Sequence, residues 1–541
     1  MATSIRRSVP ATVLALTLCL ACTAFAQPII TAPTAFDPPV SSKSALDALL
    51  HPLPQARVAE YLDRRAEPVV YDAYAGMNDA FAASFQAAGK SHTVAVGMEL
   101  DLAESDLFTA VFAEDDRNVF VGELVSVDAF ALRAVLDLSA LAPGDEIWVV
   151  DPTGPRAFGP YRASDALPDG RWTPTVEGDA IVFIAKSAAA DPPRLVVRGL
   201  SHFFKQFDIA LPCNVNIACE TSPTIQNLST GVGFMVWTNG GYDQALCSGI
   251  LINNPDTPEH EPYFMTANHC IADQDEASVA EVIWDYRAAA CDSNETPALA
   301  SLPRTDGTTL LTTNPILDMT LLLLSDVPPG ELGRAYAGYT TRPVAVGEQA
   351  FAMHHPQGSH MRITYGAVRT VDVSSAPWER QIDVMWTEGV TEGGSSGCGL
   401  FITEGGAHYY VGCLSNGPMH SCTDTTRNYD NFATFRLFYS QAGGWLAGTD
   451  PPDGPSGPVT PITCPLKAAY GDGSQALARL RAFRDQVLMA TDIGRMLVAK
   501  YYEAAPTLAR WVEEQPAART AFIVASLPFT GLSEARPAEA P

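Results

Sequence analysis

A serine surrounded by glycines is the residue in this chain best suited to act as a nucleophile. Residues 391–401 read TEGGSSGCGLF. A serine hydroxyl attacks a carbonyl only when a base takes its proton and hydrogen-bond donors hold the oxyanion that forms. Glycines permit the sharp turn that would point the N–H groups of Gly394 and Ser396 at one spot. The segment therefore predicts Ser396 as a nucleophile beside an oxyanion hole, with a simple Gly/Ser-rich hairpin turn as the alternative.

Two upstream segments supply the partners that such a serine needs. YFMTANHC places His269 after an apolar, strand-like run, and ILDMTLLLL places Asp318 ahead of another. In the predicted triad His269 accepts the proton of Ser396, and Asp318 holds the second ring nitrogen and stabilises the imidazolium. Zinc binding by His269 is the competing interpretation, but no Cys-x-x-Cys pattern supplies the other ligands. We therefore expect a serine hydrolase with no metal and no cofactor.

The chain from about Cys213 to Trp445 resembles the lysyl endopeptidase branch of the chymotrypsin-fold serine proteases. The resemblance rests on CNVNIAC, YFMTANHC, DMTLLLL, AMHHP, GVTEGGSSGCGLF and SNGPMHSC, which follow one another in the family's order. It implies two six-stranded antiparallel β-barrels with the triad between them. It also implies hydrolysis of peptide bonds after lysine through an acyl-enzyme.

Disulfide bonds are a further implication of this resemblance. Eight cysteines lie between residues 213 and 422, and in an oxidising compartment paired cysteines are the default state. The resemblance pairs three sets of them, namely Cys213 with Cys422, Cys219 with Cys291 and Cys247 with Cys270. The remaining two, Cys398 and Cys413, stand where the family has other residues, and we expect them to form a fourth bridge.

A pocket that selects a basic side chain needs a buried acid at its base. The resemblance places that acid at Asp430, and Asp424 is the competing position. The backbone of Ser415, Asn416 and Gly417 is expected to pair with the substrate as a short antiparallel strand. Lysine-specific members have a histidine where this chain has Ser415, so cleavage after arginine is considered together with cleavage after lysine.

Two further positions bear on how the pocket is held. Ser395 stands where trypsin-like enzymes have the aspartate that pairs with a new N-terminal ammonium, so this route of activation is closed. A tether at Cys213 is the predicted substitute. His354 and His355 are adjacent on a predicted strand and point to opposite faces, which predicts structural roles instead of a shared metal ion.

Composition excludes several classes of protein. The chain has 541 residues, of which 47% are hydrophobic and 18% charged, as expected for a globular protein of about three domains. Its formal charge of −27 argues against nucleic-acid binding. Residues 1–26 read as a secretory signal peptide that ends in an A-x-A cleavage site, although Cys22 leaves a lipoprotein as the alternative. No later segment has the pattern of a transmembrane helix.

The sequence predicts domains on both sides of a protease domain at residues 206–446. Residues 27–205 are expected to be propeptide-like, with an all-β sandwich at about 66–205 that is an intramolecular inhibitor or chaperone, or else a retained binding module. Cleavage after Lys205 would release it. Residues 447–463 form a Pro/Gly-rich linker. Residues 464–541 have helical periodicity. Through Cys464, AAYGDGS, LRAFRDQVL and GRMLVAKYYEAAP this part resembles the CFI-box C-terminal domain, which implies sorting or retention at the cell surface.

These observations together predict a mainly β, secreted and monomeric serine endopeptidase that acts on protein or peptide substrates with basic residues. Two other functions are compatible with the same residues. One is a surface binding protein built on a protease fold without activity, and the other is an esterase that uses the same triad.

Overall fold

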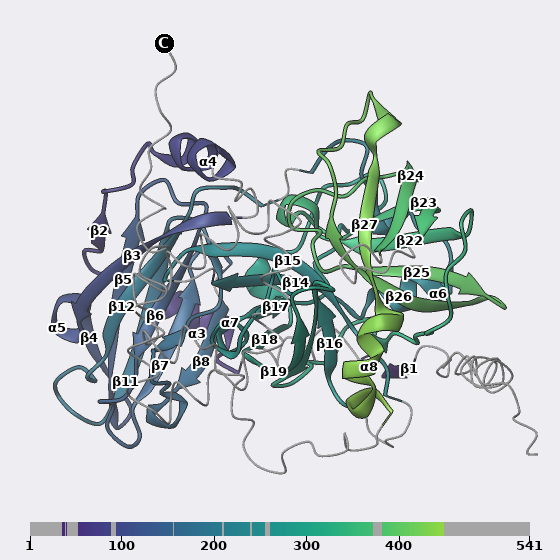
Figure 1. The fold of residues 1–541 in the computed structure, drawn as a ribbon. Coiled ribbons are helices and arrows are strands. Elements are labelled where there is room, and N and C mark those ends of the chain that lie inside the picture. Colours follow the sequence, from purple (N-terminus) through teal and green to yellow (C-terminus); the bar gives the residue numbers. More distant parts are fainter. Residues whose placement is uncertain are drawn as a thin grey trace, which may run out of the picture.

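The computed structural model describes residues 35–37, 39 and 52–447, apart from residues 88–92, 155, 208–209, 239–240, 255–259 and 372–380. The predicted signal peptide, nearly all of the predicted linker and the predicted helical domain with Cys464 lie outside the described residues. The described chain is mainly β, as the sequence predicts (Figure 1). A search of these residues finds no helix with the length and apolar character that crossing a membrane requires.

The N-terminal β region, residues 69–203, is built from two facing sheets (Figure 1). One sheet contains β2 (Val69–Tyr71), β4 (Phe108–Glu114), β5 (Arg117–Ser126), β7 (Glu146–Asp151), β8 (Arg156–Tyr161) and β11 (Ala180–Ser187). The strands that face it are β3 (Thr93–Ala103), β6 (Ala131–Asp137), β9 (Arg171–Trp172), β10 (Val176–Glu177) and β12 (Val196–Phe203). Two short helices, α4 (Asn78–Ala87) and α5 (Glu104–Leu107), complete this region.

Side chains of β5 alternate between two apolar layers, as the pleat of a strand requires. Phe120 and Leu124 face the core between the two sheets, whereas Val119 and Val121 face helix α3 (Gln55–Leu62). This helix lies ahead of the all-β sandwich that the sequence predicted at about residues 66–205, in a stretch for which no helix was predicted. Its Tyr61 is buried against the outer face of the six-stranded sheet, so the helix forms a third layer.

Strand β3 joins the N-terminal β region to the protease part, residues 213–447, which lies largely within the domain predicted at residues 206–446. It pairs with β12 on one edge and with β15 (Gln244–Leu251) on the other, so strands of both parts belong to one 12-stranded sheet. The sequence predicted a separate sandwich here, because short strands separated by turns do not reveal which neighbour a strand will pair with.

Charged and polar side chains are buried where the two parts meet. Arg133 donates to Gln244 Oε1 at 3.0 Å. The fully buried carboxylate of Glu281 accepts from the backbone N–H and the hydroxyl of Thr175 and from the guanidinium of Arg304. Buried charges are tolerated only when they are paired in this way, so the network fixes how the two parts lie against each other.

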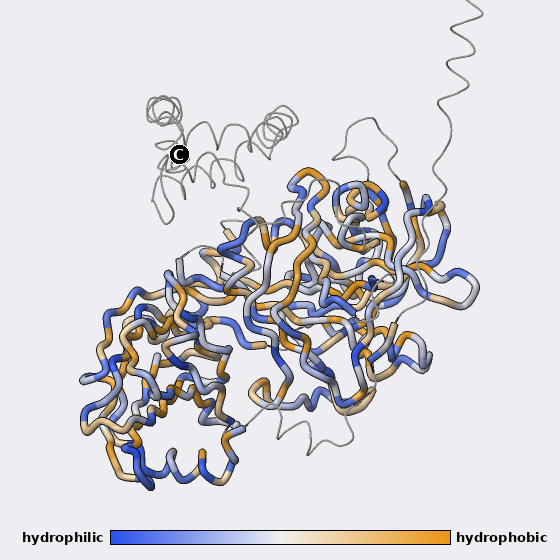
Figure 2. The backbone as a smooth tube through the Cα atoms, turned by 90° about the horizontal axis from the view of Figure 1, so that it is seen from below, coloured by the Kyte–Doolittle hydropathy of each residue, from blue (hydrophilic) through white to orange (hydrophobic). Residues whose placement is uncertain are grey.

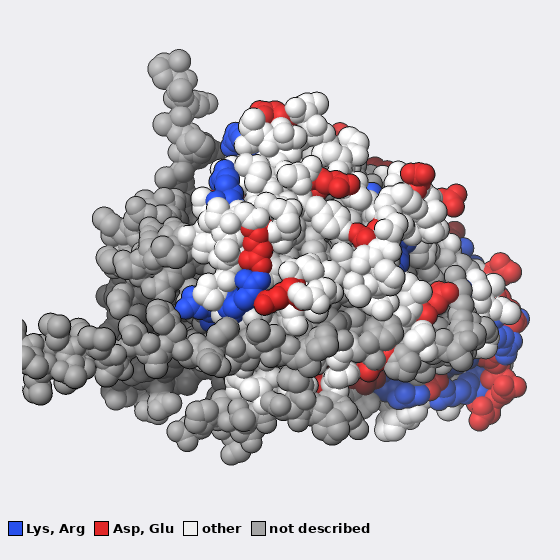
Figure 3. Space-filling view, turned by 90° about the vertical axis from the view of Figure 1, so that its right-hand side faces the viewer, with Lys and Arg blue, Asp and Glu red and all other residues white. Residues whose placement is uncertain are grey.

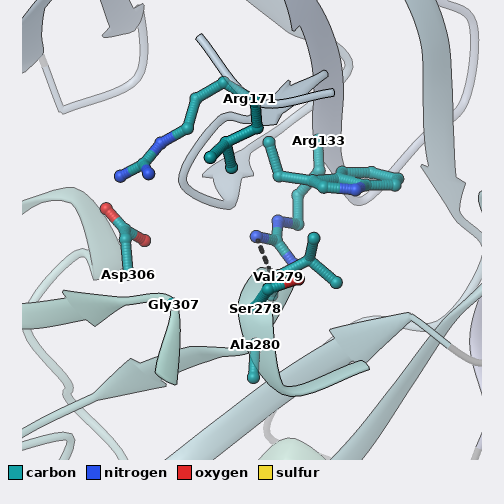
Figure 4. A pocket seen from close by; sticks show the side chains of 9 residues that line it. Arg133, Arg171, Ser278, Val279, Ala280, Asp306 and Gly307 are labelled. Carbon is teal, nitrogen blue, oxygen red and sulfur yellow. Dashed lines mark hydrogen bonds between the residues drawn. The ribbon is translucent and has the colours of Figure 1, made fainter. Parts of the chain in front are cut away.

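A small hollow lies beside this network (Figure 4). Arg133 and Arg171 line it from the N-terminal β region, and Asp306 lines it from the protease part. Burial, together with the negative charge of Glu281, raises the pKa of Asp306 to about 6. The hollow is therefore a polar gap at the interface between the N-terminal β region and the protease part.

The protease part contains one open and one closed β structure (Figure 1). The open one has β14 (Val232–Thr238), β15, β16 (Tyr263–Thr266), β17 (Glu281–Ile283), β18 (Arg304–Asp306), β19 (Thr308–Asn314) and β20 (Met319–Leu324). The closed one has β22 (Gln349–His354), β23 (Arg362–Val371), β24 (Gln381–Glu388), β25 (Gly399–Glu404), β26 (Ala407–Asn416) and β27 (Tyr429–Thr434). Pairing of β23 with β24 closes this ring.

The resemblance implied two six-stranded barrels, and the structure has one such barrel and a half-barrel, an arrangement consistent with a chymotrypsin-like fold. In the half-barrel β18 and β19 are joined through Gly307 (φ +78°), and no ladder pairs them in the described chain. Helices α6 (Pro223–Ser229), α7 (Gln274–Val279) and α8 (Phe435–Leu446) and the short strands β1 (Ala35–Asp37), β13 (Val215–Asn216) and β21 (Arg334–Tyr336) surround these strands.

Hydrophobic and hydrophilic segments alternate closely along the backbone (Figure 2). The closed barrel is filled by side chains such as Val384, Leu400 and Phe432. The face of the molecule in Figure 3 carries scattered acidic and basic side chains with wide uncharged areas between them. The charges on this face are thus not gathered into a single-sign patch.

Candidate active site

His269 and Asp318 lie next to each other at the ends of neighbouring strands. His269 follows β16, Asp318 directly precedes β20, and these two strands pair with each other. Asp318 Oδ2 accepts from His269 Nδ1 at 2.8 Å, and its Oδ1 accepts from the backbone N–H of His269 at 2.9 Å. Asp318 adopts a left-handed backbone (φ +53°), a conformation that aspartate tolerates better than most residues.

The electrostatics of this pair favour an imidazolium next to a carboxylate. Burial disfavours the charged form of both residues. The opposite charges of the two residues and the hydrogen bonds between them favour the charged forms more strongly. The pKa of His269 is therefore raised above its ordinary value and that of Asp318 is lowered. The His269 side chain is 35% exposed, so a substrate can reach the ring.

Ser396 lies in the loop between β24 and β25, where backbone N–H groups are left free. In the described chain, the N–H groups of Gly394 and Ser396 have no hydrogen-bond acceptor, whereas those of Ser395, Gly397 and Cys398 do. Gly394 has φ +92°, which a residue with a side chain could adopt only with strain. Two unoccupied donors beside a serine are what an oxyanion hole requires.

The loop that carries Ser396 is seated against the strands that carry His269. The N–H of Ser248 on β15 donates to Ser396 O at 2.8 Å, and the disulfide between Cys247 and Cys270 joins β15 to the residue after His269. Among the described residues no hydrogen bond joins the Ser396 hydroxyl to His269. Catalytic hydrogen bonds of this kind often tighten only when substrate is bound.

Hydrogen bonds of Ser395 and Gly393 hold the loop, in which Ser395 replaces the aspartate of trypsin-like enzymes. The hydroxyl of Ser395 accepts from Glu392 N at 3.0 Å and shares a hydrogen bond of 2.8 Å with His354 Nδ1. Gly393 O accepts from Gln357 N at 2.6 Å. Burial lowers the pKa of His354 to about 3, so its ring is neutral.

The segment around Cys213, which was predicted as a tether, also contacts this loop. Glu392 Oε1 accepts from Leu211 N and from Asn214 Nδ2, each at 2.7 Å. Cys213 itself is bonded to Cys422. Glu392 thus ties the chain just ahead of the protease part to the loop of the predicted nucleophile, a role that its own sequence context did not reveal.

Asp430 is a buried acid, as expected for the acid predicted at the bottom of the substrate pocket. Its Oδ2 accepts from Thr391 Oγ1 at 2.6 Å and from Trp386 Nε1, and its Oδ1 lies 3.3 Å from His420 Nε2. A Cβ on Gly417 would overlap Asp430 Oδ1, so only glycine fits there. The competing Asp424 is exposed and caps a short helical turn by accepting from the N–H and the hydroxyl of Thr426.

The segment predicted to pair with substrate lies at the end of β26. Ser415 Oγ donates to Asp318 Oδ2 at 2.7 Å, so its hydroxyl contacts the aspartate of the predicted triad directly. Asn416 and Gly417 are exposed, and the Asn416 side chain contacts Ser415 and Asn431. The backbone of this segment is therefore accessible beside Asp430.

Three of the four predicted disulfides are present, and the fourth is not. The structure joins Cys213 to Cys422, Cys219 to Cys291 and Cys247 to Cys270. The prediction of a Cys398–Cys413 bridge is wrong, because both residues are buried free thiols. Gly399 is the register partner of Cys413, so Cys398 stands opposite Leu414.

This one-residue offset places the two thiols on opposite faces of the sheet. Cys398 packs with Leu414 in the core of the closed barrel, whereas Cys413 packs with Tyr410 in the other core. A disulfide between them would have to pass through the sheet.

The zinc interpretation of His269 can be examined directly. His269, Cys247 and Cys270 form a group whose ligand atoms lie within 4.8 Å of one another in the described chain. The two sulfur atoms are bonded to each other, and His269 Nδ1 is bound to Asp318. The two sulfur atoms are therefore not available as thiolate ligands. His354 and His355 have separate partners, Ser395 and Ser359 O.

Comparisons with known proteins agree with this geometry. The family described as "Lysyl endopeptidase, C-terminal domain" matches residues 207–433. The lysyl endopeptidase of Pseudomonas aeruginosa is 29% identical over 380 residues, which cover 65% of this chain and 81% of the relative. The chain is a lysyl endopeptidase homologue. It is a lysyl endopeptidase-like serine protease, a hydrolase whose substrates are peptides.

Solved structures share less with this lysyl endopeptidase homologue. The active form of the Rv3671c protease from M. tuberculosis is 16% identical with a TM-score of 0.30, over 45% of this chain and 94% of that one. The protease Anisep from Arthrobacter nicotinovorans is 14% identical with a TM-score of 0.28, over 40% of this chain and 95% of that one.

Two residues of the site escaped the sequence reasoning although both lie inside the segments that carry the resemblance. Glu392 stands in GVTEGGSSGCGLF and His420 in SNGPMHSC. A charged or titratable residue beside a predicted nucleophile or pocket segment was the available signal. What could not be foreseen is that Glu392 binds the segment at Leu211 and Asn214, and that His420 contacts Asp430.

Proposed function

We propose that this endopeptidase cleaves peptide bonds after lysine or arginine, with Ser396 as nucleophile, His269 as general base and Asp318 as the group that orients His269. The observation that carries the proposal is the Asp318–His269 pair next to a serine loop with two unoccupied N–H donors. A buried acid beside the segment at Ser415–Gly417 supports the preference for a basic side chain.

In the proposed reaction Ser396 Oγ attacks the scissile carbonyl while its proton passes to His269 Nε2. The N–H groups of Gly394 and Ser396 hold the oxyanion. His269 then gives its proton to the leaving amine, and an acyl-enzyme remains. Water, deprotonated by His269, hydrolyses the ester and restores Ser396. Asp318 stays ionised throughout and stabilises the imidazolium.

Replacement of Ser396 tests the mechanism. Ser396→Ala should lose nearly all peptide cleavage, by a factor on the order of 10⁶, and keep the thermal stability of the parent. Ser440→Ala, at an exposed serine whose hydroxyl only contacts Leu437 O, is the matched control and should retain full activity. Undiminished cleavage by Ser396→Ala would refute the proposal.

Cut-site mapping tests the specificity. Digestion of a denatured protein followed by mass spectrometry should give peptides that end in lysine or arginine, and Asp430→Asn should abolish that preference. Labelling by a fluorophosphonate probe separates the enzyme from a binding protein without activity, because labelling requires an activated Ser396. Comparison of lysine esters with lysine amides separates a peptidase from an esterase.

We further propose that the protein is exported, processed at the predicted signal peptide, and active as a monomer. The homology to lysyl endopeptidase and the three disulfides support an extracytoplasmic location. The N-terminal β region is proposed to assist folding or restrain the enzyme, and the residues after 463 to retain it at the cell surface. Sequencing the N-terminus of the secreted protein tests the processing, and a start at Gln206 would demonstrate cleavage after Lys205.

A further inference from the structure

The carboxylate of Asp430 is already fully engaged inside the protein. Thr391 and Trp386 donate to its Oδ2, and His420 Nε2 lies 3.3 Å from its Oδ1. The side chains of both His420 and Asp430 are only 2% exposed. A pocket acid that selects a basic substrate must have a charge that no other cation has neutralised. The state of His420 therefore decides what Asp430 can offer.

The surroundings of His420 require protons on both ring nitrogens. Nδ1 lies 2.5 Å from Thr391 O, and Nε2 lies 3.3 Å from Tyr429 O as well as from Asp430 Oδ1. Carbonyl and carboxylate oxygens only accept hydrogen bonds, whereas a neutral imidazole has a single N–H. Only the imidazolium satisfies both sides of the ring, and it brings a positive charge against Asp430.

The electrostatics agree with this geometry. Burial opposes a charge on His420, but the hydrogen bond with Asp430 and its negative charge outweigh burial and raise the pKa of His420 to about 9. At neutral pH the bottom of the pocket is then formed by an ion pair of His420 and Asp430, which has no net charge.

We propose that His420 is a specificity-determining residue: as an imidazolium it neutralises Asp430 and weakens the preference for a basic side chain, and loss of its proton exposes the charge of Asp430. This inference rests on the proposed function, in which Asp430 is the acid of the pocket. His420 acts through Asp430, so it is a positioning and charge-setting residue and takes no part in bond breaking.

The other charged or titratable groups around His420 do not replace Asp430 as its partner. Glu392 approaches from the serine loop, and its carboxylate is engaged by Leu211 and Asn214. His354 on β22 is held neutral by burial, and the positive charge of Arg362 on β23 acts on both Glu392 and His354. Asp430 is thus the group on which His420 has its main effect.

A ratio of rates measures the effect without interference from the catalytic histidine. The wild-type enzyme is assayed with two peptides that differ only in having arginine or its neutral isostere citrulline before the scissile bond. Arginine keeps its charge at every pH used. Since both substrates use Ser396 and His269, the titration of His269 cancels in the ratio of their kcat/KM values. We expect this ratio to rise about tenfold or more from about pH 7 to about pH 10, because a like charge leaves the pocket.

Substitution of His420 gives the matched test. His420→Gln should show a high arginine-to-citrulline ratio that no longer depends on pH, with an increase of about tenfold over the wild type at neutral pH. His408→Gln replaces a half-buried histidine whose hydrogen-bond partners are Thr224 and Thr403, and should leave the ratio unchanged. Active sites are counted in each preparation with a fluorophosphonate probe.

The possible outcomes separate this inference from the proposed function. If the wild-type ratio is flat with pH and Asp430→Asn lowers it, Asp430 selects the cation and the inference about His420 is refuted. If Asp430→Asn leaves the ratio unchanged, the proposed specificity is also refuted.

A direct titration remains decisive if His420→Gln does not fold. In Ser396→Ala enzyme with ¹³C-labelled histidines, one ring should stay protonated until about pH 9. Its signal should lose this behaviour in the Asp430→Asn, Ser396→Ala double variant. The absence of any histidine that titrates well above its ordinary value would overturn the inference.

Discussion

The protein contains two imidazole–carboxylate pairs, His269–Asp318 and His420–Asp430, and their surroundings differ. The first pair is partly open to solvent, with His269 35% and Asp318 18% exposed, and Nε2 of His269 has no partner in the described chain. The second pair is 2% exposed on both sides, and both ring nitrogens of His420 face acceptors. The first imidazole is therefore the one suited to the proposed proton transfer, whereas the second is the one we propose to be held as a cation.

The comparison shows how one chemical pair can perform two tasks. A ring nitrogen without a partner can accept a proton, whereas an enclosed ring nitrogen that faces a carboxylate holds its proton. Burial and hydrogen-bond partners, and not residue type, separate these tasks. The following variants are expected to break or sharpen this difference.

Asp318→Asn should have the largest effect. The amide cannot stabilise an imidazolium and favours the wrong tautomer of His269, so we expect kcat to fall by about 10⁴-fold with little change in folding. Steady-state kinetics and circular dichroism measure the two properties. Asp424→Asn, at an exposed acid outside the pocket, is the control. A loss of less than about tenfold would show that His269 works without its carboxylate.

Gly417→Ala should damage the second pair and leave the first intact. The new methyl group would overlap Asp430 Oδ1 and approach Tyr429 O at 3.1 Å, so Asp430 must move. Displacements of this size typically cost about 10²-fold, and we expect that loss in kcat/KM for arginine substrates and a smaller loss for citrulline ones. Gly154→Ala, where a Cβ meets nothing closer than 3.5 Å, is the matched control. Equal losses for both substrates would contradict the assignment of Asp430.

His420→Gln should change stability in a pH-dependent way. The folded-state pKa of His420 is about 9, above its unfolded value of about 6.5. Its protonated form therefore stabilises the fold fully below pH 6.5, and this contribution is lost as the pH rises through about 9. We expect the variant to lose about 2 kcal/mol near pH 6 and little near pH 10. Urea denaturation at both values measures it. A pH-independent loss would indicate packing instead of charge.

Ser415→Ala should have the smallest effect. It removes the hydroxyl that donates to Asp318 Oδ2 at 2.7 Å but leaves both bonds from His269 to that carboxylate. One hydrogen bond to a charged group corresponds to about tenfold in kcat. Ser415→Thr keeps the hydroxyl and should restore much of the rate. A loss as large as that of Asp318→Asn would mean that Ser415 acts on substrate as well.

The sequence was sufficient where function resides in local motifs. His269, Asp318 and Ser396 each stand in a short segment with a recognisable pattern, and the structure places the first two in contact. The mainly β class and three disulfides were also predicted correctly. These features depend on the identity of neighbouring residues and on the resemblance that those residues carry.

The features that were missed depend on register and on contacts between distant segments. Cys398 and Cys413 looked like a pair, but a one-residue offset between β25 and β26 separates them. The role of His420 emerges only when its loop packs on β27, and helix α3 is defined by its burial against a sheet. Such relations are set by tertiary packing, which one sequence does not show.

The pairing of β3 with β15 determines what a break in the backbone would achieve. Lys205 follows β12, is half-buried, and lies near the ring of Phe204. Hydrolysis after it would cut a covalent connection but leave the shared ladder and the Glu281 cluster intact. The two fragments would then separate in denaturing electrophoresis and still elute together in gel filtration. To separate the fragments, the contacts between the two parts of the protein would have to be broken, and Glu281 would then lose its hydrogen bonds from Thr175.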